Sequence, residues 1–241
     1  MSIGNRQHIL LMNQKAPRIN MVLKNTKIYA KTIEVDIQLL TKALIVSDFH
    51  ISQLLDVDRS TEVFFRKFNR LIQKENPSSI FILGDIFHWH TAMSQELYNS
   101  FFKKIEVYKK ETFIIPGNHD VSHGKTFFCH YENGMYVHPI ECDALILKTG
   151  TNYVCFGHHF KNNTRSHTRS RIKILLENIR FKMNCIPKDS LLICGHTHED
   201  HSFPEMNSYS LGPFMADKNH TSYGILQYNN DSGFNFQPML L

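Results

Sequence analysis

Residues that can ligate a metal ion or transfer a proton stand directly after five short apolar runs of the sequence. In chain order the five blocks are Ser47-Asp48-Phe49-His50, Gly84-Asp85, Gly117-Asn118-His119-Asp120, Gly157-His158-His159 and Gly195-His196-Thr197-His198. Carboxylate, amide oxygen and imidazole all bind divalent cations, and imidazole also carries protons near neutral pH. Chance is a poor explanation for five such blocks, which together indicate a site assembled from loops.

The last block poses a question of geometry. Gly195 permits a sharp turn, and the spacing of His196 and His198 places both side chains on one side of an extended backbone. Such a pair fits the binding of one ligand, the ligation of two metal ions, or two solvated loop side chains. The spacing alone does not choose among these.

The five blocks must be positioned by the elements around them. The apolar runs do not alternate, which is typical of strands buried on both faces. They are Ala43–Val46, Ile80–Leu83, Thr112–Ile115, Tyr153–Phe156 and Leu191–Cys194. Between the runs, apolar side chains repeat at helical spacing in 59–75, 93–108 and 169–183. Strands alternating with helices predict an α/β fold, in which ligands gather beyond the strand ends.

The ends of the chain are expected to extend this fold. Residues 1–41 are partly strand-like and are predicted to add edge strands, and 223–236 read as a closing hairpin with its turn at 229–233. No linker forces a second unit, so we expect one domain over residues 1–241.

Composition limits the function classes. A net charge of +5 over 241 residues is too small to indicate a nucleic-acid binder but suits an anionic substrate. The five cysteines are odd in number and form no Cys-x-x-Cys pair, which favours free thiols in a reducing, cytoplasmic setting. No apolar run approaches a membrane span. Peripheral membrane contact and the oligomeric state are left open.

The ordered combination of blocks resembles the calcineurin-like metallophosphoesterase family. Its pattern runs Asp-x-His, Gly-Asp, Gly-Asn-His-Asp/Glu, a lone His after a strand, and Gly-His-x-His. The resemblance covers about residues 42 to 200. It implies a four-layer αββα sandwich, in which two mixed β-sheets are flanked by helices and a dinuclear metal site lies at the strand ends.

The resemblance also implies a ligand set. One metal ion would be held by Asp48, His50 and His198, and the other by Asn118, His158 and His196. Two divalent cations about 3.5–4 Å apart need a shared anionic ligand, which a carboxylate can provide and a histidine cannot. Asp85, central in chain order, is the expected bridge, and the histidines of the last block would then serve different metals.

Two residues of the third block are expected to act on the substrate. By resemblance, His119 would face the scissile phosphate, where it stabilises charge or protonates the leaving oxygen. Asp120 is predicted to hold the His119 imidazole in one tautomer, with a simple loop cap as the alternative.

The fourth block departs from the commonest form of this motif in the family, which is His-Gly-His. Phe156 occupies the position of the ligand histidine in that motif, which precedes the glycine. His158 instead fits the Gly-His form found in other branches of the family. Neighbouring side chains point to opposite faces of a strand, so we expect His158 and not His159 to join the site.

The ligand types also bear on the metal and the reaction. Imidazole, carboxylate and amide without thiolate suit Mn, Fe or Zn, and we expect two Mn ions first. The expected reaction is hydrolysis of a phosphoester or pyrophosphate bond by a metal-bound hydroxide, since no Ser or Cys is placed to attack. His88 and His90, which follow the second block, are further candidates to reach the substrate.

The motif Gly84-Asp85-Ile86-Phe87-x-Trp89 resembles the corresponding motif of the family branch that contains UDP-2,3-diacylglucosamine hydrolases. A basic helical insert at 160–188 would suit a lipid-linked, phosphorylated substrate, although charge runs are usually solvated helix faces. A nuclease or a cyclic-nucleotide phosphodiesterase is the alternative, less favoured because the insert lacks interleaved aromatics. A third alternative is a non-catalytic scaffold with this fold. Such scaffolds tend to lose metal-site or catalytic residues, whereas all five blocks of this sequence retain them.

Overall fold

The computed structural model describes most of the chain from residue 30 onward. The described residues are 30–51, 56–88, 94–122, 125–126, 131, 134–158, 174–175, 178–179, 182, 189–215 and 221–241. His90, His159 and most of the predicted basic insert therefore lie outside the described residues.

The first sheet contains the first three predicted strands as parallel neighbours. They are β2 (Ala43–Val46), β3 (Ser79–Leu83) and β4 (Glu111–Ile115), and their side chains are almost all buried. The full order is β14-β13-β2-β3-β4-β7, with β7 at Val137–Pro139, β13 at Ser222–Asn229 and β14 at Gly233–Leu240. The predicted closing hairpin is thus β13–β14, which pairs antiparallel to β2.

The second sheet contains the other two predicted strands, β9 (Asn152–His158) and β10 (Leu191–Gly195), again parallel neighbours. Its order is β1-β8-β9-β10-β12-β11. The remaining strands are β1 (Ala30–Glu34), β8 (Ala144–Thr149), β11 (His201–Phe203) and β12 (Ser208–Ser210). A separate two-stranded ladder joins β5 (Val121–Ser122) to β6 (Lys125–Thr126).

Two long helices lie where the apolar stripes predicted them. Helix α1 (Val57–Glu75) begins after Asp56, whose side chain accepts from Arg59 N, and ends at Asn76 in the left-handed conformation. Helix α2 (Gln95–Glu106) begins after Ser94, which accepts from Leu97 N. The described residues also include three short 3₁₀ turns, namely η1 (Ile37–Leu40), η2 (Asn118–Asp120) and η3 (Pro204–Met206).

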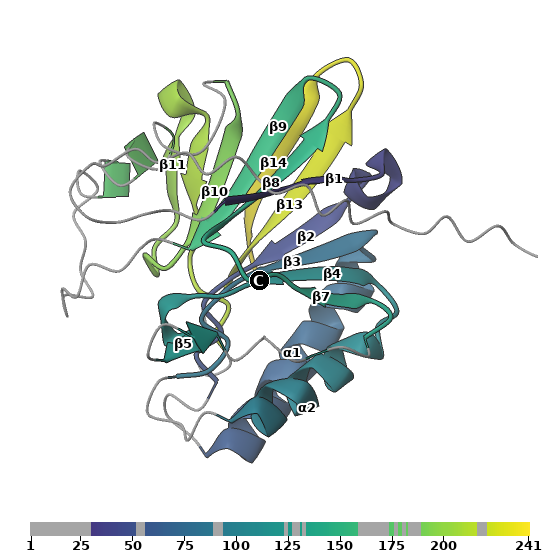
Figure 1. The fold of residues 1–241 in the computed structure, drawn as a ribbon, viewed down its shortest axis with the longest axis vertical. Helices are drawn as coiled ribbons and strands as arrows, with labels where there is room; N and C mark the ends of the chain where they lie inside the picture. The colour runs from purple at the N-terminus through teal and green to yellow at the C-terminus, as the bar shows by residue number, and fades with distance from the viewer. Residues whose placement is uncertain are drawn as a thin grey trace, which may run out of the picture.

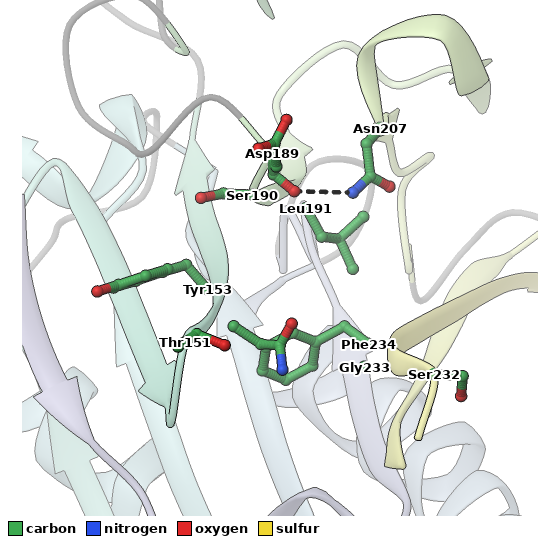
Figure 2. A pocket seen from close by; sticks show the side chains of 10 residues that line it. Thr151, Tyr153, Asp189, Ser190, Leu191, Asn207, Ser232, Gly233 and Phe234 are labelled. Carbon is green, nitrogen blue, oxygen red and sulfur yellow. Dashed lines mark hydrogen bonds between the residues drawn. The ribbon is translucent and has the colours of Figure 1, made fainter. Parts of the chain in front are cut away.

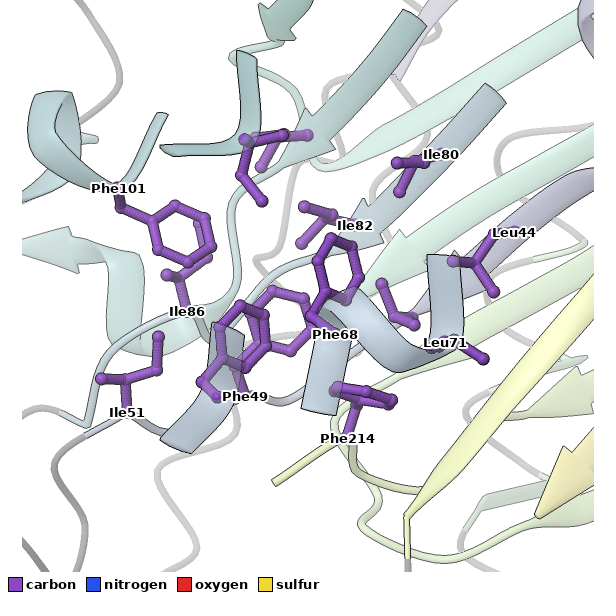
Figure 3. Close-up of a cluster of buried hydrophobic side chains, with 14 of the residues drawn as sticks. Leu44, Phe49, Ile51, Phe68, Leu71, Ile80, Ile82, Ile86, Phe101 and Phe214 are labelled. Carbon is purple, nitrogen blue, oxygen red and sulfur yellow. The ribbon is translucent and has the colours of Figure 1, made fainter. Parts of the chain in front are cut away.

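The two faces of the first sheet bury different cores. On β3, Ile80 and Ile82 pack against α1 and α2, together with the aromatic cluster in Figure 3. Phe81 and Leu83 point the other way and pack between the sheets. Figure 1 shows the same layering, with α1 and α2 on one side of β2–β4 and the second sheet on the other. The predicted architecture of two mixed sheets with flanking helices is confirmed.

The outer face of the second sheet is contacted by a few described helical residues. Residues 174, 175, 178, 179 and 182 have helical backbone and fall within the predicted 169–183 helix. Asn178 is fully buried and donates to Ser208 Oγ on β12, and Lys182 donates to the Met206 carbonyl. No described helix is both long enough and apolar enough to cross a membrane.

The end of the sandwich away from the five blocks is held by a buried carboxylate. Glu75, the last residue of α1, pairs with Lys42 Nζ at 2.9 Å and accepts from the Tyr223 hydroxyl at 2.8 Å. Burial opposes ionisation of Glu75, but its hydrogen bonds with Lys42 and Tyr223 outweigh it and lower the pKa of this carboxyl. The group thereby connects α1 to both β13 and the start of β2.

We predict that Glu75→Gln lowers the free energy of unfolding by about 1–3 kcal/mol at pH 7, because a charge-assisted contact is lost. Since the folded-state pKa lies below the unfolded value, the contribution is present above that value and disappears as pH falls through the folded pKa. The difference from wild type in urea unfolding should therefore shrink in acid. Glu34→Gln, which removes an exposed partner of Lys148, is the control and should change stability far less. A difference independent of pH would contradict this account.

Candidate metal centre

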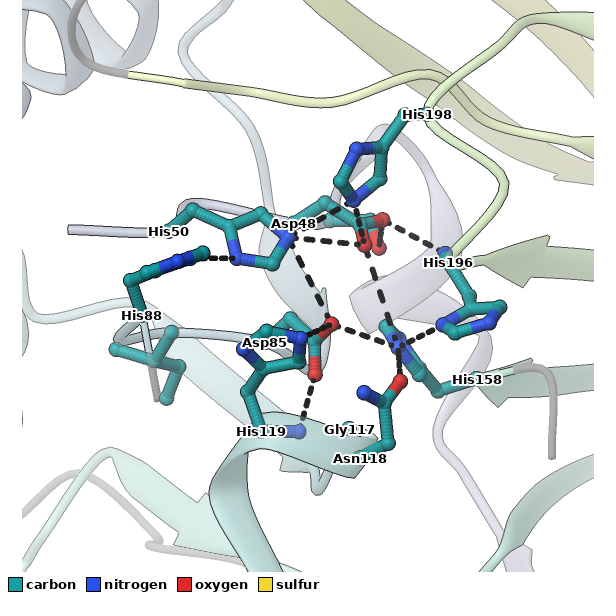
Figure 4. Close-up of polar contacts among 12 residues, drawn as sticks. Asp48, His50, Asp85, His88, Gly117, Asn118, His119, His158, His196 and His198 are labelled. Carbon is teal, nitrogen blue, oxygen red and sulfur yellow. Dashed lines mark hydrogen bonds and ion pairs between the residues drawn. The ribbon is translucent and has the colours of Figure 1, made fainter. Parts of the chain in front are cut away.

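The five predicted blocks converge at one edge of the sandwich (Figure 4). Three follow β2, β3 and β4 of the first sheet, and two follow or end β9 and β10 of the second. Because parallel strands end at the same edge of a sheet, residues up to 150 positions apart in sequence, such as Asp48 and His198, come into contact. The site is thus shared between the sheets.

The first two loops extend the pairing of β2 with β3. Asp48 N donates to the Gly84 carbonyl at 3.1 Å, and His50 N donates to the Asp85 carbonyl at 3.0 Å. Between the two site residues, Phe49 turns into the core, where its ring lies 4.5 Å from that of Phe64 on α1. The apolar residue of Asp-Phe-His therefore fixes the loop while its neighbours face the site.

Backbone strain is concentrated in these loops. Five non-glycine site residues have positive φ: Asp48 (55°), His50 (44°), Asp85 (54°), His196 (82°) and His198 (57°). This conformation costs an L-residue about 1–2 kcal/mol and persists only where surrounding contacts enforce it. The two histidines of the last block thus share one side of the chain through left-handed turns, not through the extended backbone assumed from their spacing.

Glycines stand where the loops touch. A Cβ on Gly117 would overlap both the carboxylate and the backbone nitrogen of Asp85, and a Cβ on Gly195 would overlap the Ser47 hydroxyl. That hydroxyl lies 2.5 Å from Asp48 Oδ2, which also accepts from His196 N at 2.8 Å. Glycine is therefore needed at 117 and 195 so that neighbouring loops approach closely.

The site residues form two groups that share Asp85. One group comprises Asp48, His50, Asp85 and His198, and the other comprises Asp85, His158 and His196. Asp85 Oδ2 lies 3.6 Å from His50 Nε2 and 3.2 Å from His158 Nε2. Asn118 Oδ1, 3.2 Å from His158 Nε2, adjoins the second group. The predicted ligands are thus brought together in the predicted pairing, and their binding of two ions stays a prediction.

His158 is oriented by a carbonyl oxygen. Its Nδ1 donates to the Leu83 carbonyl at 2.7 Å, which directs Nε2 into the site. There, Nε2 lies 3.2 Å from His196 Nδ1 as well as near Asn118 and Asp85. Burial opposes protonation of His158, but the charges of Asp85 and Asp48 outweigh it and raise its pKa to about 9. The surroundings of Nε2 therefore attract positive charge.

The surroundings of the Asp48 carboxylate show that the residues fit a metal ion. Its Oδ1 is buried and has no hydrogen-bond partner, although it lies 3.4 Å from His198 Nε2 and 3.7 Å from His50 Nε2. Burial opposes ionisation, yet the imidazoles of His158, His198 and His50 hold the pKa of Asp48 well below its usual range. An unpaired anionic oxygen among converging imidazole nitrogens fits a divalent cation.

The contacts of Asp120 are those of a loop cap, which was the alternative expected from the sequence. Its Oδ2 accepts from Asp85 N at 2.7 Å and Gly117 N at 2.9 Å, and its Oδ1 accepts from Ile86 N at 3.1 Å and the Tyr98 hydroxyl at 2.6 Å. A carboxylate has about four acceptor sites, so these bonds saturate it. Asp120 thus shapes the backbone of two site loops, whereas its action on the His119 ring stays a prediction.

His119 borders the first group together with His88. Its backbone N–H donates to Asp85 Oδ1 at 2.8 Å, and its ring centroid lies 4.8 Å from that of His50. Burial, followed by the charges of neighbouring histidines, lowers the pKa of His119 to about 4 against the opposing effect of Asp85. His50, His88 and His119 also form a third group of potential ligands. Of the pair His88 and His90, the described member thus borders the site.

The contact of Tyr98 with the site, through its hydrogen bond to Asp120, was not predicted from the sequence. Tyr98 lies on α2, outside the apolar stripe that predicted the helix, and its partner is 22 residues away. No local pattern carries that pairing.

A second recess lies at the opposite ends of β9 and β10 (Figure 2). Its volume is about 250 Å³, and it is lined by hydroxyl and amide groups, Asp189, Tyr153, Leu191 and Phe234. None of its lining residues is Lys, Arg or His. Because the recess offers no positive charge and includes the Asp189 carboxylate, it suits a phosphate group less well than the five blocks, which remain the candidate site.

Residues 41–219 match the calcineurin-like phosphoesterase family. The chain belongs to this family. The match spans all five blocks, and the buried His/Asp groups are those of a metallophosphoesterase domain.

Individual relatives are distant. The uncharacterized protein R555 of Acanthamoeba polyphaga mimivirus is 38% identical over 81 residues, which are 31% of this chain and 6% of R555. The chain therefore spans a small part of the length of this relative. One solved structure is 10% identical, with a TM-score of 0.50, over 83% of this chain and 99% of that chain. Thermotoga maritima protein TM1076 is 16% identical, with a TM-score of 0.48, over 84% of this chain and 100% of that chain. At these identities the first structure supports a shared fold alone.

We predict that Gly117→Ala sharply reduces metal uptake, because the added methyl group must displace the shared Asp85 carboxylate. Gly117 has φ of −92°, so alanine adds no backbone strain there. Gly150→Ala is the control, since Gly150 has φ of 58° but nothing within 4 Å of an added Cβ. It should cost about 1 kcal/mol of stability through strain and leave uptake unchanged. Elemental analysis of both variants after Mn²⁺ loading provides the test, and equal metal contents would refute the steric argument.

Proposed function

We propose that this protein is a dinuclear-metal-dependent hydrolase that cleaves a P–O bond of a small or lipid-linked phosphorylated substrate. The observation that carries the proposal is the Asp85 carboxylate, which belongs to both ligand groups. Two cations held about 3.5–4 Å apart need such a shared anion, and the chain belongs to a phosphoesterase family.

The ligand assignment follows the two groups. Asp48, His50 and His198 would hold one ion, Asn118, His158 and His196 the other, and Asp85 both. The unpaired Asp48 Oδ1 and the converging Nε2 of His158 support this division. Mn is the first choice and Fe or Zn the alternatives, because the set mixes imidazole with oxygen ligands. When bound, the two ions would lower the pKa of water to about 7 and thereby supply a nucleophile.

His119 is proposed to act on the leaving group. Its backbone is fixed on Asp85, and its partly exposed ring stands beside the first ligand group. A phosphoryl group held over the site would place its leaving oxygen within reach of this imidazole, which would stabilise the charge that develops there. His88, whose ring centroid is 5.3 Å from that of His119, would contribute a further contact to the phosphate.

The substrate class rests on charge and on resemblance. The chain is basic, and the Gly84-Asp85-Ile86-Phe87-x-Trp89 wording resembles hydrolases of UDP-2,3-diacylglucosamine, whose scissile bond is a pyrophosphate. Of the basic residues in the insert, the described Lys182 donates to the Met206 carbonyl. Burial also lowers the pKa of Lys182, so we assign this lysine to packing and not to substrate binding.

We predict that the protein binds two Mn²⁺ ions per chain. Asp85→Ala should abolish both sites because it removes the shared ligand, whereas His50→Ala should weaken mainly one. His158→Ala should lower the occupancy and His159→Ala should not. Elemental analysis and titration of metal-free protein would measure these effects. Lys148→Ala, in an exposed ion pair outside the site, is the control. A protein that stays metal-free after loading would exclude the proposal.

We predict activity in a Mn²⁺-supplemented screen of phosphomonoesters, diesters, cyclic nucleotides and nucleoside-diphosphate conjugates, with the conjugates cleaved best. On the best substrate, His119→Ala should lower kcat by about 10²–10⁴-fold with nearly unchanged metal content. The loss should be smaller for an aryl phosphate, whose leaving group needs no proton. An equal loss on both substrates would argue against action on the leaving oxygen. Preferential cleavage of nucleic acid, with binding that weakens steeply in salt, would favour the nuclease alternative.

A further inference from the structure

Tyr98 reaches the site from helix α2, outside the five blocks. Its ring is fully buried and meets the Phe87 ring edge-on, with centroids 5.0 Å apart. Its hydroxyl donates to Asp120 Oδ1 at 2.6 Å. One side chain therefore contacts the loop that carries Asp85 and also the carboxylate that holds that loop.

The four donors to Asp120 differ in origin. Three are backbone N–H groups of Asp85, Ile86 and Gly117, which belong to the loops that Asp120 shapes. The fourth, Tyr98, is a side chain on a separate helix, and helix α2 is fixed to the first sheet through the apolar core. Tyr98 thus ties the carboxylate to a rigid element and not only to the loops themselves.

The Asp85 backbone needs that support. Its φ of 54° is a conformation that an L-residue adopts only under constraint, and the bonds from Asp85 N and Ile86 N to Asp120 supply the constraint. A small rotation of the Asp120 carboxylate would lengthen both bonds. The direction of the shared Asp85 carboxylate therefore depends on where Asp120 is held.

We propose that Tyr98 is a positioning residue for the metal pair: its hydroxyl fixes Asp120, and Asp120 fixes the backbone that presents the Asp85 carboxylate to both ligand groups. The proposal rests on the proposed function, because it needs two ions to share Asp85. Tyr98 touches neither substrate nor metal in this scheme. It acts through two other residues.

Tyr98→Phe removes the hydroxyl and keeps the buried ring, so the variant should fold. Asp120 is fully buried, which leaves little access for water to replace the lost donor. Tyr223→Phe is a matched control, since Tyr223 is also a buried tyrosine that donates to a carboxylate, Glu75 Oε1, at 2.8 Å and away from the site.

Mn²⁺ affinity is the main measurement, made by competition with a fluorescent chelator. Tyr98→Phe should bind Mn²⁺ about tenfold more weakly, as is usual when a residue that orients a ligand is lost. Tyr223→Phe should retain wild-type affinity even where its stability falls as much. Excess Mn²⁺ should restore kcat in Tyr98→Phe, which it would not do if a reacting group had been removed.

Amide hydrogen exchange of the metal-free protein gives a second readout. The amides of Asp85 and Ile86 should exchange faster in Tyr98→Phe, while those of β3 and β13 change no more than in Tyr223→Phe. Unchanged Mn²⁺ affinity in Tyr98→Phe, with two ions still bound by the wild type, would overturn the positioning role and leave the proposed function intact. A wild-type protein that binds no Mn²⁺ would overturn both.

Discussion

Two buried carboxylates held among imidazoles set the requirements for the whole site. Asp48 and Asp85 are almost fully inaccessible to water, and burying such charges costs several kcal/mol each unless positive charge compensates them. Neutral imidazoles offer no net charge, so balance requires either protons on the histidines or cations between them. The raised pKa of His158 and the unpaired Asp48 Oδ1 both reflect this need for positive charge. The arrangement is therefore built around positive charge.

The loops bring these carboxylates and imidazoles together by adopting strained, left-handed backbone conformations. Left-handed residues at Asp48, Asp85 and His196 would relax if their surroundings allowed it. Three kinds of contact prevent this: the backbone bonds between the first two loops, the saturated Asp120 carboxylate, and the Phe49 ring in the aromatic core. Packing beneath the site and polar contacts around it thus act on the same loops.

Much of this arrangement was readable from the sequence because it follows simple periodicities. The apolar run Ala43–Val46 is β2 to the residue, and the stripe in 59–75 is nearly all of α1. Chain order then placed the five blocks at one edge. The left-handed backbone of Asp85 was not predictable, since intrinsic preference assigns that conformation to glycine. Strands as short as β11 and β12 show no period, and the partner of Tyr98 is set by the docking of α2.

The sharing of the site between two sheets has a consequence for how the protein folds. Asp48 and His198 belong to opposite layers, and their contact forms only when the apolar core between the sheets has closed. The complete ligand set is therefore absent from any partly folded chain in which the layers are apart. Cations that bind only the closed form draw the equilibrium towards it by mass action. Ions bound at this edge would thus stabilise the closed sandwich, so metal supply would set the fraction of folded protein as well as its chemistry.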